Sequence, residues 1–276
     1  MLDAGAFKAN ERKAWDLCAE NYDRCLTRAF TPIAQKLVSL AQPSSGERIL
    51  DVATGNGLAA LLAARMIGPD GRVVGVDLSE TMVDLAWIRA REEGVNNADF
   101  LAMDAEDLDL PSECFDAVLC ALGLMLFPQP DRALRETYRV LREGGRVALA
   151  VFGRGSRVAL RALMEPFIPL MPPPPQRGPS IFGYGQSEVL EEALEGAGFS
   201  EVTTEQCTHV LTFSEAEGAW DMLLSLGRLA QMHAQLSAAA QEELRRQVLH
   251  ITREQFTNAQ GSLELPFEIT YALARR

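Results

Sequence analysis

Short apolar runs alternate with helical patterns along the middle of the chain. The runs predict strands at residues 48–52, 72–76, 99–103, 115–121 and 146–152, and the segments between them predict helices at 58–67, 79–94 and 131–142. Ser79 suits the N-cap of the second helix, and Gly94 suits its end. Strands that alternate with helices form a mostly parallel sheet with helices on both faces. The pattern therefore predicts a doubly wound, Rossmann-like α/β fold.

The two ends of the chain show different patterns. Residues 11–42 have apolar positions at helical spacing, and a breaker, Pro43 to Gly46, follows them. Seven prolines lie between Pro166 and Pro179, four of them consecutive at Pro172 to Pro175, which predicts a stiff, extended segment. Such a segment serves as a rigid connection, as part of a lid, or as a ligand for a partner's aromatic groove. The remaining elements expected are a helix from a cap at Ser187 to Gly196, strands at 201–213 and 265–274, and helical sequence at 215–257.

Composition narrows the class of protein. The chain has 276 residues, 47% of them hydrophobic, and 38 acidic against 26 basic residues give a net charge of −12. That charge argues against nucleic acid or anionic membranes as partners. Five cysteines without a C-x-x-C pair indicate a reduced, cytoplasmic protein, and three histidines without a metal-binding pattern argue against zinc. We find no export signal at the N-terminus and no apolar run long enough to span a membrane.

The turn after the first predicted strand is rich in glycine. Gly55-x-Gly57-x-x-Ala60 lets the backbone approach a ligand closely, at the point where a helix presents free N–H groups. Asp77 follows the second strand and suits a ribose-binding acid. These features alone also fit a dinucleotide site, so an NAD(P)-dependent oxidoreductase stays open at this point.

Two further carboxylates favour S-adenosylmethionine over a dinucleotide. Asp51 ends the first strand, where it would repel a pyrophosphate but attract the ammonium and sulfonium of S-adenosylmethionine, either directly or by holding the glycine loop. Asp104 follows the third strand and can accept a hydrogen bond from the adenine amino group. Asp77 would accept from the ribose hydroxyls, with Leu78 and Met82 against the adenine face. Each aspartate alone suits a helix cap or a turn equally well, so the prediction rests on all three strand ends together.

The motifs along residues 12–153 resemble those of one enzyme class. Leu50 to Gly57, Val74 to Ser79, Asp104 to Glu106, Phe115 to Val118 and Arg139 to Arg146 are similar to the successive motifs of class I S-adenosylmethionine-dependent methyltransferases. Within that class, they most resemble the ubiquinone and menaquinone C-methyltransferase group (methyltransferase type 11) and its natural-product relatives. The resemblance implies a sheet of seven strands whose last strand is antiparallel.

The resemblance also implies roles for particular parts of the chain. Residues 1–45 would form a helical lid, 46–153 the cofactor-binding core, and 154–276 the rest of the sheet with a substrate cover, all in a single domain. Trp15 to Tyr22 would belong to the lid, with Tyr22 near the methionine end of the cofactor or simply packing the helix. The predicted cofactor contacts are Tyr22, Asp51, Ala53, Thr54, Gly55, Asn56, Gly57, Asp77, Leu78, Met82, Asp104, Ala105 and Ala121.

The methyl acceptor is less well defined by the sequence. Methyl transfer is an in-line displacement that needs alignment and exclusion of water, and a base only if the acceptor must lose a proton. His209 and Tyr184 are the two candidate bases. The apolar segment from Ala121 to Pro128 lacks the Asn-Pro-Pro-Tyr-type motif of nucleobase enzymes, and it either faces a lipophilic or aromatic acceptor or packs the core.

Several questions stay open from the sequence. The acidic cluster of magnesium-dependent catechol enzymes is missing, and oxygen, carbon and nitrogen acceptors are all compatible with the motifs. We expect a small-molecule acceptor, with the oligomeric state, monomer or homodimer, undetermined. A non-catalytic module that keeps the fold is the second alternative to a methyltransferase.

Overall fold

The computed structural model describes residues 3–171 and 180–276. Pro172 to Pro175 and Pro179 lie outside the described residues, so the extended form expected for them stays a prediction. The described start of that segment differs from the expectation, because residues Glu165–Leu170 form a 3-10 helix, η3. The fixed φ of Pro166 at its start suits such a helix as well as an extended chain.

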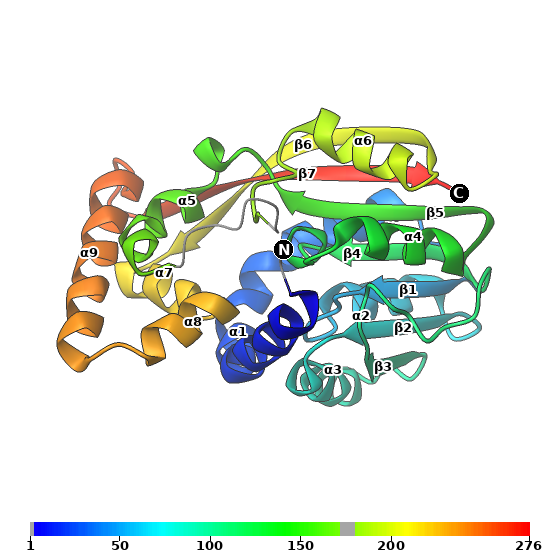
Figure 1. Cartoon of the computed structure of the whole chain (residues 1–276), viewed down its shortest axis with the longest axis horizontal. Coiled ribbons are helices and arrows are strands. Elements are labelled where there is room, and N and C mark those ends of the chain that lie inside the picture. Colours follow the sequence, from blue (N-terminus) through cyan, green and yellow to red (C-terminus); the bar gives the residue numbers. More distant parts are fainter. Residues whose placement is uncertain (1–2, 172–179) are drawn as a thin grey trace.

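A seven-stranded sheet forms the centre of the molecule (Figure 1). Its strand order is β3-β2-β1-β4-β5-β7-β6. The pairs β1–β2, β1–β4, β2–β3 and β4–β5 are parallel, whereas β7 runs antiparallel to both β5 and β6. The strands are β1 (Arg48–Val52), β2 (Arg72–Asp77), β3 (Ala98–Ala102), β4 (Phe115–Ala121), β5 (Leu141–Phe152), β6 (Ser200–Phe213) and β7 (Leu263–Arg275). The predicted fold class is thus confirmed.

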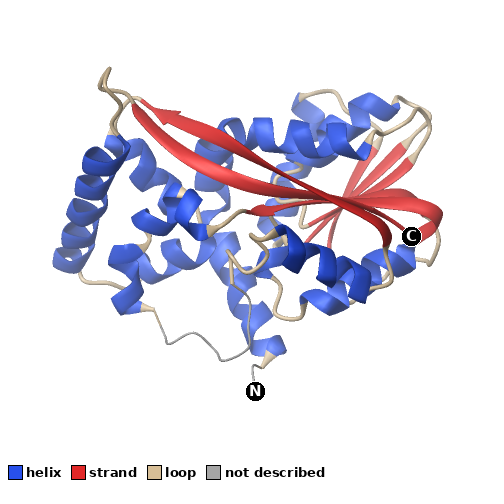
Figure 2. Cartoon of the chain, turned by 90° about the horizontal axis from the view of Figure 1, so that it is seen from above, coloured by secondary structure: helices blue, strands red, loops and turns tan. Residues whose placement is uncertain are grey.

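Helices pack on both faces of this sheet (Figure 2). α1 packs against both α2 and α3 beside the strands β1 to β5, and α4 and α6 pack against each other beside β5, β6 and β7. The α-helices are α1 (Ala4–Ala41), α2 (Leu58–Ile67), α3 (Glu80–Glu92), α4 (Pro130–Val140), α5 (Ala159–Leu163), α6 (Ser187–Gly196), α7 (Ala216–Leu223), α8 (Gly227–Ala234) and α9 (Ala238–Phe256). Short 3-10 helices lie at Leu124–Leu126 (η1) and Gly155–Arg157 (η2). None of the described helices is both long and apolar enough to cross a membrane.

Two local predictions need correction. The N-cap of α6 is Gln186, which makes no side-chain cap bond, and Ser187 is already the first helical residue. The helix expected at 131–142 ends at Val140, and β5 begins at Leu141 because Leu141 pairs with Phe115. The register of β4 and β5 then shifts, so the two glycines after Glu143 lie in an irregularity of a strand rather than before its start.

The antiparallel pair β6–β7 extends beyond the parallel part of the sheet. β5 pairs with β7 only from Ile269 to Arg275, whereas β6 follows β7 as far as Leu263. The free part of this ribbon reaches toward α5, α7 and α9, which lie together on the left of Figure 1. It therefore carries the C-terminal helices past the carboxyl ends of the parallel strands, where ligands of such sheets bind.

Candidate active site

The glycine loop after β1 is held by the carboxylate of Asp51. Its Oδ2 accepts hydrogen bonds from Thr54 Oγ1 at 2.7 Å and from the backbone N of Ala60 at 3.0 Å. The loop contains three residues with left-handed backbone, Ala53 (φ 55°), Gly55 (φ 54°) and Gly57 (φ 81°). A side chain on Gly55 would meet no atom within 4 Å, so open space adjoins the loop there. Asp51 therefore holds the loop through hydrogen bonds, while open space lies next to Gly55.

The second oxygen of Asp51 has no partner among the described residues. Oδ1 is buried and accepts no hydrogen bond. Burial raises the pKa of this carboxyl to about 7, although the bonds from Thr54 and Ala60 oppose the rise. A buried acceptor without a donor is destabilising, and a cation beside it would remove that cost. The arrangement fits the ammonium of a methionine-type ligand better than a phosphate.

Asp77 joins the end of β2 to the glycine loop. Its Oδ2 accepts from the backbone N of Gly55 at 2.8 Å, and its Oδ1 accepts from the backbone N of Ser79 at 2.9 Å. Burial raises the pKa of this carboxyl, and these backbone bonds act against that rise. A carboxylate has about four acceptor positions, so Asp77 keeps capacity for ligand hydroxyls. Leu78 is half-buried beside it, and Met82, in the first turn of α3, is buried.

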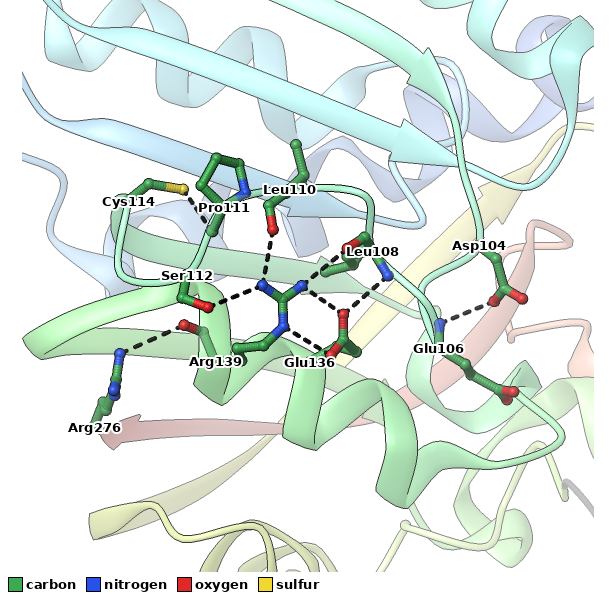
Figure 3. Close-up of polar contacts among 10 residues, drawn as sticks. All are labelled: Asp104, Glu106, Leu108, Leu110, Pro111, Ser112, Cys114, Glu136, Arg139 and Arg276. Atoms are coloured by element: carbon green, nitrogen blue, oxygen red, sulfur yellow. Dashed lines mark hydrogen bonds and ion pairs between the residues drawn. The ribbon is translucent and has the colours of Figure 1, made fainter.

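The loop after β3 places Asp104 at the same edge of the sheet (Figure 3). Asp104 Oδ1 accepts from the backbone N of Glu106 at 2.9 Å, and Ala105 between them is buried. Lys8, from the first turns of α1, donates to Asp104 Oδ2 at 2.7 Å and also pairs with Glu106. Burial lowers the pKa of Lys8, but the bonds to these two carboxylates outweigh it and raise the pKa above its ordinary value. The ammonium thus stays charged.

The rest of this loop is anchored to α4. Arg139 donates to the carbonyls of Leu108 and Leu110 at 2.9 and 2.8 Å, and Glu136 accepts from the backbone N of Leu108 at 3.0 Å (Figure 3). Arg139 and Glu136 also bind each other, which holds both side chains in place. α4 therefore holds the part of the loop that follows Asp104.

Helix α1 covers the loops after β1 and β2. Asp16 accepts a 2.6 Å bond from Ser79 Oγ, and Asp23 accepts from Asn56 Nδ2 at 2.6 Å. The Asn56 amide, predicted to contact cofactor, is thus committed to α1. Burial raises the pKa of the Tyr22 phenol, and the negative charge of Asp77 raises it further.

Sequence reasoning did not identify Lys8, Asp16 or Asp23 as part of the site. The three residues lie eight and seven positions apart, so they share one face of α1. This spacing was the feature of the sequence that could have indicated a shared role. The three residues belong to no local motif, because their partners come from loops far along the chain.

The loops after β1 and β4 pack directly on each other. The strand order reverses between these two strands, which makes this the switch point of the sheet. A side chain on Gly123 would come within 2.6 Å of the Ala53 Cβ, and Leu122 is left-handed (φ 60°). Ala121 ends β4 half-buried, whereas Leu124 and Met125 are buried. Leu124 and Met125 therefore pack the core rather than face an acceptor.

A series of aromatic rings leads from α1 toward the end of β5. Neighbouring ring centroids are 5.8–6.5 Å apart, and each pair of rings is edge-to-face or tilted. In order, the rings are Trp15, Tyr22, Phe30, Phe267, Phe152 and Phe182. Rings at these distances attract one another beyond their burial. Phe30, Phe267 and Phe152 in the middle of the series are buried, whereas the rings at its two ends are half-buried.

The two candidate bases lie apart from the glycine loop. His209 is on the edge strand β6, with β7 and β5 between it and β4, and its Nε2 is 2.8 Å from the Tyr271 hydroxyl. Burial and the neighbouring Lys36 lower the pKa of His209. Burial raises the pKa of Tyr184 to about 12, with a further contribution from Asp131, so its phenol is neutral at pH 7. Their catalytic role stays a prediction.

Known proteins identify the class. A family model described as a methyltransferase domain matches residues 49–145. The chain is 32% identical over 219 residues to the aklanonic acid methyltransferase DauC of a Streptomyces species, which covers 75% of this chain and all of that enzyme. It is also 38% identical over 118 residues to the ubiquinone/menaquinone biosynthesis C-methyltransferase UbiE of Pseudomonas entomophila, over 42% of this chain and 46% of that one.

A solved structure confirms the fold. The YcgJ protein from Bacillus subtilis superposes with a TM-score of 0.59 at 17% identity, over 88% of this chain and 97% of that one. Together with the sequence relatives, this shows that the chain belongs to the class I S-adenosylmethionine-dependent methyltransferases. Its cofactor is S-adenosylmethionine, and the oxidoreductase alternative is not supported.

Proposed function

We propose that this methyltransferase acts on a small aromatic or lipophilic metabolite held beyond the carboxyl end of β5. The aromatic series from Tyr22 to Phe182 carries the proposal, because it starts on α1 over the proposed cofactor loops and reaches Phe267, in the free part of the β6–β7 ribbon, before it ends at Phe182. Ring edges and faces suit a planar apolar acceptor. The names of the relatives, which refer to aklanonic acid and to ubiquinone and menaquinone biosynthesis, support an acceptor of this kind.

We further propose which residue binds each part of the cofactor. When bound, S-adenosylmethionine supplies a methyl group on a sulfonium, which is already a strong electrophile. Asp51 would hold the glycine loop and face the cationic end, Asp77 the ribose hydroxyls, and Asp104 the adenine amine. α1 would act as the lid that excludes water, with Tyr22 on its inner face.

The absence of a poised base among the two candidates shapes the expected acceptor. His209 is bound to Tyr271, and the Tyr184 phenol holds its proton at neutral pH. An acceptor that ionises in water, such as a carboxylic acid or an acidic phenol, needs no base from the protein. We therefore propose an acidic acceptor. This agrees with the name of the relative that acts on aklanonic acid.

A transfer assay tests the proposal. Purified protein is incubated with methyl-labelled S-adenosylmethionine and a panel of aromatic acids, phenols, quinone precursors, and matched polar amines and nucleosides. We expect transfer to the aromatic acids and phenols, with heat-inactivated protein as control. Transfer confined to the polar compounds would contradict the proposed acceptor class. Binding of S-adenosylhomocysteine without transfer to any compound would instead favour a non-catalytic module.

A further inference from the structure

Lys8 occupies a place between two carboxylates at the edge of the proposed adenine site. Its Nζ is 2.7 Å from Asp104 Oδ2 and also pairs with Glu106. The Lys8 side chain is only 17% exposed, and that of Glu106 is 1% exposed. Glu106 in addition accepts a 2.6 Å bond from the backbone N of Gln129, at the start of α4. Lys8, Asp104 and Glu106 thus form a small, mostly buried ion cluster.

Glu106 keeps Lys8 in this place. A carboxylate as deeply buried as Glu106 is strongly destabilising without a cation beside it. Lys8 supplies that charge, while Asp104 is about one-third exposed and can face solvent or a ligand. We therefore expect Lys8 to keep its ion pair with Glu106 when a ligand binds to Asp104.

The remaining hydrogen-bonding capacity of the cluster matches adenine. An ammonium has three N–H donors, of which Asp104 and Glu106 take two. Asp104 Oδ2 accepts from Lys8 and Oδ1 from the backbone N of Glu106, which leaves further lone pairs. One N–H of Lys8 and lone pairs of Asp104 are thus left over from these contacts, on two groups that are bound to each other. Adenine presents the complementary pair, an amino donor next to a ring-nitrogen acceptor.

We propose that Lys8 is a cofactor-specificity residue, which donates to a ring nitrogen of adenine while Asp104 accepts from the adenine amine. The inference rests on the proposed placement of the cofactor along Asp51, Asp77 and Asp104. It assigns to the first turns of α1 a direct role in recognition of the base, beyond covering the site. The same turns also contact α8, because Glu11 pairs with Arg228 there.

The test combines a change in the ligand with a change in the protein. Binding of S-adenosylhomocysteine and of its 1-deaza and 7-deaza analogues, each lacking one ring nitrogen, is measured by calorimetry on wild-type protein and on Lys8→Met. We expect the wild type to bind one of the analogues about tenfold more weakly than S-adenosylhomocysteine, as for loss of a bond to a charged donor. Lys8→Met should bind all three ligands with similar affinity.

Two further variants separate this role from a structural one. Lys36→Met removes another lysine of α1, which pairs with Glu205 at 2.9 Å outside the cluster, and should behave as wild type. Lys8→Met combined with Glu106→Gln removes the unpaired buried charge, in case Lys8→Met alone does not fold. The inference is wrong if wild-type protein binds both analogues as tightly as S-adenosylhomocysteine, or if the Lys8 variants retain the discrimination.

A separate result would identify a failure of the proposed cofactor placement. Asp104→Asn should weaken binding of all three ligands in wild-type background. If Asp104→Asn binds S-adenosylhomocysteine normally while the deaza analogues are still discriminated, the adenine lies elsewhere and another donor recognises it. That outcome overturns the roles of both Asp104 and Lys8, whereas equal binding of all ligands by wild type overturns the role of Lys8 alone.

Discussion

The cofactor edge and the proposed acceptor region of this enzyme are built in opposite ways. At the cofactor edge, carboxylates at the ends of β1, β2 and β3 accept hydrogen bonds from backbone N–H groups of the segments that directly follow β1, β2 and β3, as Asp77 does from Gly55 and Ser79. In the acceptor region, the aromatic rings come from parts far apart in the chain, as with Phe30 and Phe267, and they contact each other through apolar surface.

The difference follows from what each region has to bind. A cofactor shared by a whole class can be bound by short polar motifs, since its donors and acceptors do not vary. An acceptor that differs between enzymes is bound by shape and apolar contact, which many side-chain combinations provide. The predictions that follow test whether the two regions are separable in this way.

The largest effect is expected from Asp77→Ala. Loss of the proposed charge-assisted bonds to ribose and of the bond to Gly55 should weaken affinity for S-adenosylhomocysteine by about 1–3 kcal/mol, roughly 5- to 160-fold. The acceptor KM should change little. Calorimetry measures the first quantity and initial rates the second. Asp99→Ala is the matched control, because Asp99 pairs with Arg72 near the opposite end of β2 and β3. Unchanged affinity in Asp77→Ala would show that Asp77 does not bind the cofactor.

The next effect concerns pH and Asp51. Its folded-state pKa of about 7 lies above the ordinary value of 3.8, so the carboxyl is increasingly protonated below pH 7. A cationic ligand favours the carboxylate, and affinity for S-adenosylhomocysteine should therefore rise with pH from about 5.5 to 7, by at most about tenfold per pH unit. Asp51→Asn should remove this dependence. A wild-type affinity that is flat over this range would contradict the proposed contact.

The raised pKa of Asp51 also affects the stability of the enzyme without cofactor. Between about pH 4 and pH 7 the folded state holds the Asp51 proton and the unfolded state does not, so the contribution of Asp51 to stability falls as pH rises and is constant above that window. Urea unfolding of wild type and Asp51→Asn across this range measures the difference between their free energies of unfolding. The expected difference grows in favour of the variant as pH rises.

A smaller effect is expected in the acceptor region. Phe267→Leu removes the buried ring between Phe30 and Phe152, and loss of contacts of about 0.5–1.5 kcal/mol each should loosen the aromatic series and raise the acceptor KM by up to roughly 12-fold. Cofactor affinity should not change. Phe199→Leu is the control, because Phe199 is also buried but packs on Tyr138 instead. Equal changes in KM for the two variants would indicate a general packing effect.

The smallest effect is expected from His209→Gln. His209 binds Tyr271 on β6, with β5 and β7 separating it from β4. Methyl transfer to the best acceptor should therefore keep its rate within about twofold and its pH profile unchanged, as for a residue outside the chemistry. Rates measured between pH 6 and 9 check this. A loss of tenfold or more would instead make His209 a base, which its pairing opposite Phe267 on the β6–β7 ribbon would allow.

Local patterns predicted the elements of the parallel sheet closely. β1, α2 and β4 have the predicted bounds, and Ser79 caps α3 through its hydroxyl, because each depends on nearby residues. The errors arose where pairing across the sheet decided the outcome. Leu141 belongs to β5 because it pairs with Phe115, which its own neighbours do not reveal.

The sequence by itself determined the fold class, the methyltransferase class and the cofactor, because glycine turns and strand-end carboxylates are local and act at fixed spacing. Only the tertiary structure brought Lys8 to Asp104 and Glu106, which lie almost a hundred residues further along the chain, and Asp23 to Asn56, because the charges of α1 suit many partners equally well. It likewise assembled the aromatic series, since apolar side chains carry no directional signal in sequence.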